Sequence, residues 1–223
     1  MVREIVLDTE TTGFEPAQGH RLVEIGCIEL LNHVPSGRIF HTYINPEREV
    51  PQDAYAVHGL SYDFLKAHPP FREVGDTFLA FIEDTPLVIH NAKFDMKFLN
   101  AELKTHDWSE LSFSRTIDTL IMARQKFPGS PASLDALCKR FGVDNKARDK
   151  HGALLDAELL AEVYLELIGG KQPELSLNFS SSPANIGKEE KKERKVREPR
   201  LHESTQEELE LHQELVEKLK KKG

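Results

Sequence analysis

Short apolar runs and alternating segments in the first fifty residues predict three β-strands. Residues 4–8 (Glu-Ile-Val-Leu-Asp) form a continuous apolar run, which is typical of a strand buried on both faces of a sheet. Residues 22–30 alternate in part, and residues 38–44 alternate up to Asn45-Pro46. Because short turns join the three segments, we expect an antiparallel meander.

The pattern then changes to a helical period, interrupted by short strands at residues 87–90 and 116–118. Asn91 is expected to cap one helix, and Gly169-Gly170 to end the last one. Helices are predicted over residues 76–83, 91–103, 119–125, 133–141 and 152–168. Strands followed by strand–helix alternation predict an α/β fold, with a mixed sheet flanked by helices.

The composition changes after residue 170, so residues 1–170 are predicted to form one domain. Residues 171–187 include Ser180-Ser-Ser-Pro and predict a flexible linker, and residues 188–223 form a charged tail. Within the tail, Ser204 and Glu207 have the spacing of a capping box. An amphipathic helix is therefore expected over residues 204–222, with a solvated charged tail as the alternative.

The charge of the chain is unusual for a protein that binds nucleic acid. The net charge is −8, and residues 188–223 hold 11 of the 29 basic and 10 of the 37 acidic residues. The remaining 18 basic and 27 acidic residues give the rest of the chain a charge of −9. Since lysine and arginine supply most non-specific DNA affinity, such a body is expected to need metals or a partner to hold DNA.

The chain shows no secretory pattern and no apolar run long enough to span a membrane. Cys27 and Cys138 both lie in apolar segments and are interpreted as buried, reduced side chains. A cytoplasmic location follows as the expectation.

Two acids stand at the end of the first predicted strand. Asp8 and Glu10 are two residues apart, so their side chains point to the same face. Two carboxylates in one place repel each other unless a divalent cation binds between them. Hard oxygen ligands of this kind suit Mg²⁺ or Mn²⁺. The alternative is a solvated strand end.

Three further residues complete the candidate site. Asp95 and Asp156 each adjoin the apolar stripe of a predicted helix, and His151 precedes the helix that carries Asp156. Four carboxylates can hold two metal ions for in-line attack on a phosphodiester, with His151 as the base that deprotonates the water. Asp118 is interpreted as a helix cap, with support of the site as the alternative, and Asp135 as a first-turn acid that favours its helix dipole.

These residues resemble the three motifs of the DEDDh exonucleases. The matching segments are Asp8-Thr-Glu10-Thr-Thr-Gly13, Asn91-x-x-Phe-Asp95 and His151-x4-Asp156. The resemblance implies a ribonuclease-H-like fold with a mixed five-stranded sheet. It also implies two divalent cations held by Asp8, Glu10 and Asp156 with help from Asp95, and His151 as the catalytic base.

The resemblance extends over residues 1–170 to the epsilon proofreading subunits of bacterial DNA polymerase III. It includes Val57-His58-Gly59-Leu60 and Phe127-Pro128-Gly129. It implies a 3′→5′ DNA exonuclease in which Asp53 and His58, together with the metal-binding acids Asp8, Glu10 and Asp156, contact the DNA 3′ end. Asp53 stands where the family has a glutamate.

The resemblance also implies partners for the C-terminal part of the chain. The helix in residues 204–222 is expected to dock on the catalytic (alpha) subunit of the polymerase. Residues 174–179 (Glu-Leu-Ser-Leu-Asn-Phe) resemble a motif that binds the sliding clamp, with an extra Asn and no initial Gln. Two alternatives remain: a free-standing DNA or RNA trimming exonuclease, and a catalytically silent subunit that only binds polymerase.

Overall fold

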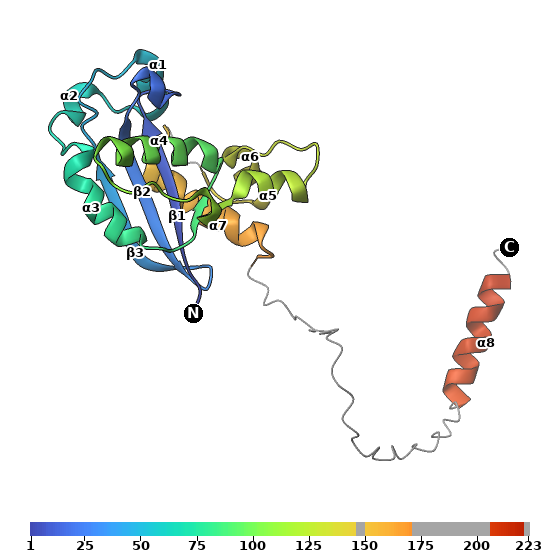
Figure 1. Cartoon of the computed structure of the whole chain (residues 1–223). Helices are drawn as coiled ribbons and strands as arrows, with labels where there is room; N and C mark the ends of the chain where they lie inside the picture. Colours follow the sequence, from blue (N-terminus) through green and yellow to red (C-terminus); the bar gives the residue numbers. More distant parts are fainter. Residues whose placement is uncertain (146–149, 171–205, 221–223) are drawn as a thin grey trace, which may run out of the picture. The chain divides into compact units, whose positions relative to one another are not determined.

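The computed structural model describes residues 1–145, 150–170 and 206–220, and its body is built on a five-stranded sheet (Figure 1). The spatial order is β3-β2-β1-β4-β5. β1 pairs antiparallel with β2, β2 pairs antiparallel with β3, and β4 and β5 continue the sheet parallel to β1. The strands are β1 (Arg3–Thr11), β2 (Leu22–Leu31), β3 (Val34–Tyr43), β4 (Leu87–Ile89) and β5 (Thr116–Asp118). The predicted meander and mixed sheet are confirmed.

Seven helices flank this sheet in the described part of the body, and the five predicted ones are all present. The helix predicted from residue 76 begins earlier, at Phe71, after Pro70. α1, α2 and two 3-10 turns were not predicted. The helices are α1 (Gln52–His58), α2 (Tyr62–Leu65), α3 (Phe71–Ile82), α4 (Ala92–Thr105), α5 (Thr119–Lys126), α6 (Leu134–Phe141) and α7 (Ala153–Leu167), and the 3-10 turns are η1 (Pro16–Gln18) and η2 (Phe113–Arg115).

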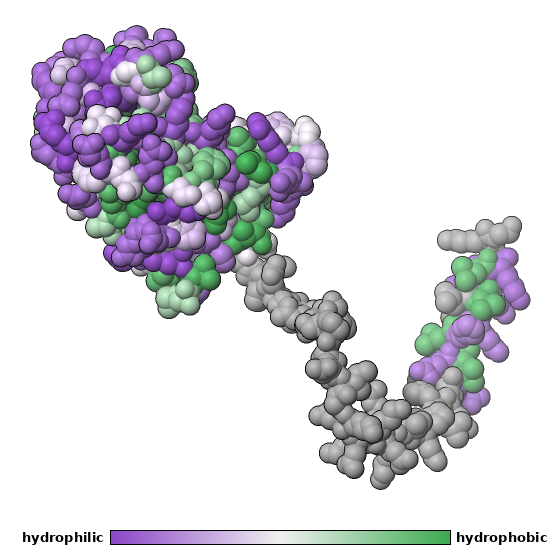
Figure 2. All heavy atoms as spheres, in the orientation of Figure 1, coloured by the Kyte–Doolittle hydropathy of each residue, from purple (hydrophilic) through white to green (hydrophobic). Residues whose placement is uncertain are grey.

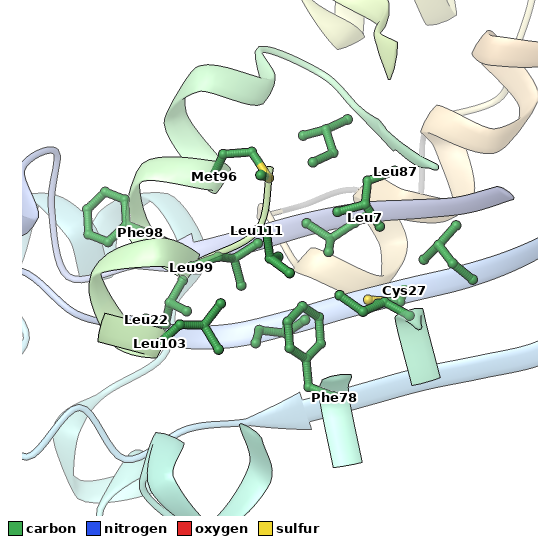
Figure 3. Close-up of a cluster of buried hydrophobic side chains, with 14 of the residues drawn as sticks. Leu7, Leu22, Cys27, Phe78, Leu87, Met96, Phe98, Leu99, Leu103 and Leu111 are labelled. Carbon is green, nitrogen blue, oxygen red and sulfur yellow. The ribbon is translucent and has the colours of Figure 1, made fainter. Parts of the chain in front are cut away.

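The alternation of side chains along β1 creates two cores, one on each face of the sheet. Ile5 and Leu7 pack with α3 and α4, whereas Val6 packs with α5, α6 and α7. Figure 3 shows Leu7 in the first core, near Phe78 of α3 and Leu99 of α4. The predicted burial of Cys27 and Cys138 is confirmed. The end of β1 therefore lies between two layers of helices.

The third strand begins four residues earlier than predicted, at Val34. Asn32 and His33 form the turn before it, with left-handed φ values of 51° and 66° that suit a two-residue hairpin. β3 contains Pro35, and it is an edge strand, where proline is tolerated.

In the C-terminal unit, the structure describes only the helix α8 (Gln206–Lys220). This helix lies within the range predicted from the sequence, residues 204–222. Leu209, Leu211 and Leu219 are 52%, 66% and 64% exposed, and Figure 2 shows apolar and polar side chains along this helix. The predicted linker, the clamp-like residues 174–179 and Ser204 of the capping box lie outside the described residues. Among the helices described, none has the length and apolar character needed to cross a membrane.

Candidate active site

The carboxyl end of β1 carries two of the predicted acids on one side of the sheet. Asp8 and Glu10 continue the side of Val6, on which α7 packs, and Glu10 is only 8% exposed. Asp8 pairs across the ladder with Gly26 of β2. A Cβ atom on Gly26 would lie 2.4 Å from the backbone of Ala153, so this glycine allows the start of α7 to approach the sheet.

The start of α7 brings a carboxylate and a histidine to these acids. Asp156 is 3% exposed, and His151 Nδ1 lies 3.2 Å from Asp156 Oδ2. One ligand atom from each of Glu10, His151 and Asp156 lies within 4.8 Å of the other two. Carboxylate oxygens gathered in this way suit a hard divalent cation, so the donor set fits the metal site expected from the sequence.

Asp95 reaches the same cavity from the opposite face of the sheet. It lies in the first turn of α4, is 3% exposed, and accepts a 2.7 Å hydrogen bond from Thr9 Oγ1. Burial raises the pKa of Asp95 from 3.8 to about 7, and a bound cation would favour its ionised form. The four predicted acids and His151 line one cavity of about 310 Å³.

Asp118 holds the start of α4, which carries Asp95. Its carboxylate accepts hydrogen bonds from the N–H groups of Leu120 and Ile121, which confirms the predicted cap of α5. The same carboxylate accepts from the N–H groups at 91 and 92, at 3.2 and 3.1 Å. Asn91 holds the predicted position before α4, but its backbone is left-handed (φ 66°) and its side chain makes no cap hydrogen bond.

Asp53 and His58 line a second cavity of about 300 Å³ that shares Glu10 with the first. Both residues belong to α1, with Asp53 exposed in its first turn and His58 5% exposed at its end. Asp135, which was not predicted as a ligand, lies in the first turn of α6 and lines the first cavity, where it accepts a hydrogen bond from Asn145. The predicted site residues therefore fall into two adjoining groups.

The imidazole ring of His58 is neutral and can donate one hydrogen bond. Burial lowers its pKa from 6.5 to about 4, and its Nδ1 accepts a 3.0 Å hydrogen bond from the N–H of Leu60. The proton of the neutral ring is therefore on Nε2. Nε2 is buried and has no hydrogen-bond partner within the described residues. It remains able to donate to a bound molecule.

Two features of the site were missed in the sequence. Thr9, between the two acids of β1, is the residue that binds Asp95. Phe14 is 81% exposed and lines the second cavity beside Phe94. An aromatic residue directly after the acidic motif and its glycine is the sequence signal for Phe14, because an exposed aromatic beside a polar cavity is suited to stacking on a base.

Comparison with known proteins adds three results. The Exonuclease family model (RNase_T) matches residues 5–164. The DNA polymerase III subunit epsilon of Rickettsia conorii is 52% identical over 224 residues, covering 99% of this chain and 97% of that protein. The subunit of the same name from Escherichia coli K12 is 41% identical over 233 residues, covering 100% and 96%.

A solved structure shares the fold. The nuclease domain of 3′hExo, described as a DEDDh family member bound to rAMP, matches with a TM-score of 0.64 at 18% identity. The match covers 74% of this chain and 91% of that domain. It confirms the predicted ribonuclease-H-like exonuclease fold.

Proposed function

This chain belongs to the exonuclease family, as one of its DNA polymerase III epsilon subunits, and we propose that it proofreads DNA during replication in the cytoplasm. It removes mispaired nucleotides from DNA 3′ ends by hydrolysis, as a subunit of the replicative polymerase. The observation that carries this proposal is the convergence of Glu10, His151 and Asp156, whose ligand atoms lie within 4.8 Å of one another.

Exonucleases of this family use divalent metal ions. We propose two ions, Mg²⁺ or Mn²⁺, held by Asp8, Glu10 and Asp156, with Asp95 as a supporting ligand. When bound, such ions activate water and stabilise the charge on the attacking and leaving oxygens. The burial of Asp95 and Asp156 supports this assignment, because buried carboxylates are costly to ionise without a compensating charge.

His151 acts as the general base in this proposal. The contact of its Nδ1 with Asp156 orients the imidazole ring, and Nε2 takes the proton from water. A ring held in one orientation loses less entropy when it reaches the water, so the contact favours proton transfer.

The second cavity takes the terminal nucleotide. Asp53 and His58 approach it from α1, and the Nε2–H group of His58 donates to an oxygen of the nucleotide. Phe14 stacks on a base at the exposed rim. A mispaired end reaches this cavity more readily because it costs less to separate from its template.

The proposed function is tested with the purified full-length chain and a 5′-labelled primer on a template, with a matched or mispaired 3′ end. We expect shortening from the 3′ end in the presence of Mg²⁺, faster at the mispaired end, and none with a chelator. Asp8→Ala should lower the rate by more than about a hundredfold. Loss of a residue that only supports a metal ligand already lowers metal affinity or activity by about 10- to 100-fold. Asp63→Ala, at an exposed acid of α2, is the matched control.

Two results would contradict this function. Equal rates on RNA and DNA ends would favour a free-standing trimming enzyme. No activity with either metal would favour a subunit that only binds polymerase, and activity unchanged by Asp8→Ala would contradict the catalytic assignment.

The domain organisation forms part of the same proposal. Residues 1–170 form the exonuclease domain, residues 171–187 link it to the tail and carry the clamp-binding motif, and residues 188–223 include the helix that docks on the polymerase alpha subunit. Support comes from α8, whose Leu209, Leu211 and Leu219 are exposed within the described residues. Exposed leucines along a helix are suited to docking in an apolar groove.

A further inference from the structure

The main chain of His151 is held by α1. The backbone N–H of His151 donates to the carbonyl of Val57 at 3.2 Å. Val57 lies in the last turn of α1, where helix carbonyls have no partner within the helix. The helix therefore fixes the backbone of the histidine, while Asp156 contacts its ring.

The residue before this histidine makes a second contact with α1. Lys150 Nζ lies 4.7 Å from the centre of the Tyr55 ring, in a cation–π geometry. Gly59, which follows α1 with a φ of +75°, allows the lysine stem to lie close by. A Cβ atom on Gly59 would lie 2.6 Å from Lys150 Cδ. Lys150 and His151 thus both contact α1.

α1 also reaches the cavity assigned to the terminal nucleotide. Asp53, Val57 and His58 all line that cavity. One seven-residue helix therefore borders the substrate side of the site and holds the segment that carries the base. A fixed α1 keeps the distance between the nucleotide and the base constant.

We propose that Tyr55, Val57 and Lys150 form a clasp that positions His151 for catalysis, with Tyr55 and Lys150 as positioning residues. The inference rests on the role of His151 as the base in the proposed function. Tyr55 and Lys150 are absent from the lining of both cavities, so they act on His151 through the main chain. It restricts the backbone at residues 150–151, so that the imidazole stays against Asp156.

Tyr55→Ala in the full-length protein tests the clasp. We expect kcat to fall about two- to fivefold and KM for the DNA end to stay unchanged. A change of this size corresponds to the free energy of one cation–π contact at an exposed lysine. Tyr55→Phe keeps the ring and should restore the wild-type rate. A readout independent of catalysis is trypsin cleavage after Lys150, which should be faster in Tyr55→Ala than in the wild type at equal Tm.

Controls separate this inference from the proposed function. Phe64→Ala removes an exposed aromatic side chain of α2 outside the clasp and should leave kcat and cleavage unchanged. If Tyr55→Ala behaves as the wild type in both readouts, the clasp is overturned, although an inactive His151→Ala protein would leave the proposed function standing. If Lys150→Ala instead raises KM in a salt-dependent way at constant kcat, Lys150 contacts DNA phosphates and the clasp is overturned.

Discussion

Neighbouring residues at the end of β1 have different roles because they point to opposite faces of the sheet. Asp8 and Glu10 point toward α7 and its Asp156, whereas Thr9 points toward α4 and binds Asp95. The same alternation that builds two cores therefore brings acids from two helix layers into one cavity. Asp95 depends on a hydroxyl group that belongs to none of the predicted ligands.

Thr9→Val tests this dependence. The substitution keeps the shape of the side chain but removes the 2.7 Å hydrogen bond to Asp95. Because hydrogen bonds to charged groups are worth about 1.5–3 kcal/mol, we expect the Mg²⁺ concentration for half-maximal activity to increase about tenfold or more. Steady-state rates across an Mg²⁺ titration measure it. Thr105→Val, which loses an exposed hydrogen bond to Ala101 on the same helix, is the matched control, and an equal shift in both proteins would contradict the prediction.

His58 gives the folded protein a pH dependence of known sign. Its pKa is lowered to about 4, so the folded state binds the proton less tightly than the unfolded state, for which 6.5 is the ordinary value. The stability linked to neutral His58 is complete above pH 6.5 and is lost as the pH falls toward 4. The free energy of unfolding in urea should therefore fall less steeply over this range in His58→Gln than in the wild type. Equal pH dependence of the free energy of unfolding in the two proteins would contradict this prediction. His212→Gln on α8 is the control and should match the wild type.

Among the elements, those that bury a regular apolar pattern were predictable from the sequence. β1 and β2 follow from their apolar runs, and α6 and α7 follow from apolar residues at helical spacing. α1 was missed because its seven residues bury only His58 and show no apolar stripe. The position of Asp53 and His58 in the site therefore came from the family resemblance alone.

The cap of α4 shows another limit of sequence reasoning. A residue just before a helix is the ordinary cap, so Asn91 was chosen. In the structure Asp118, distant in sequence, accepts from the N–H groups of Asn91 and Ala92. This partner becomes available only because β4 and β5 lie side by side, which no local pattern contains.

Gly26→Ala tests the approach of α7 to the sheet. A Cβ atom at residue 26 would meet the backbone of Ala153 at 2.4 Å, so α7 and Asp156 must move away from Asp8. Overpacking of this kind costs about 1–3 kcal/mol, which lowers Tm by about 2–12 °C in a domain of this size. A displacement of about 1 Å at the site lowers kcat about a hundredfold.

Thermal unfolding and single-turnover rates measure the two effects. Gly152→Ala is the control for Tm, because no atom lies within 4 Å of its Cβ position and its backbone is extended. A Gly26→Ala protein with wild-type Tm and kcat would mean that the contact between the sheet and α7 does not position Asp156.

At the scale of the whole molecule, the negative charge of the chain opposes the binding of DNA, which is also negatively charged. A nuclease must hold a polyanion, yet residues 1–187 carry a net charge of −9. In the described body, conspicuous cations such as Arg3, Arg21 and Arg38 are paired with buried Glu29 or Glu102. The charges of these arginines are therefore balanced in part by acids of the fold. Tethering to a polymerase supplies local DNA concentration without a basic surface.

Removal of everything after Gly170 tests this division of labour. The proposed active-site residues all lie before that point, so the truncated protein should keep its wild-type kcat on short single-stranded DNA. It should no longer co-purify with the polymerase alpha subunit. A substitution with the same aim is Leu211→Ser, which removes a 66% exposed apolar side chain of α8, and Glu217→Gln on the same helix is its matched control.

The salt dependence of the rate then distinguishes tethering from direct DNA binding. Non-specific DNA affinity falls steeply with salt, whereas an apolar helix contact does not. Addition of alpha subunit should therefore make excision by the full-length protein less sensitive to salt, at primer concentrations below KM, and leave the truncated protein unaffected. An effective concentration in the millimolar range, typical of short tethers, is enough to produce this difference. If the truncated protein gains the same protection, the polymerase contacts the exonuclease domain itself, and α8 is not the dock.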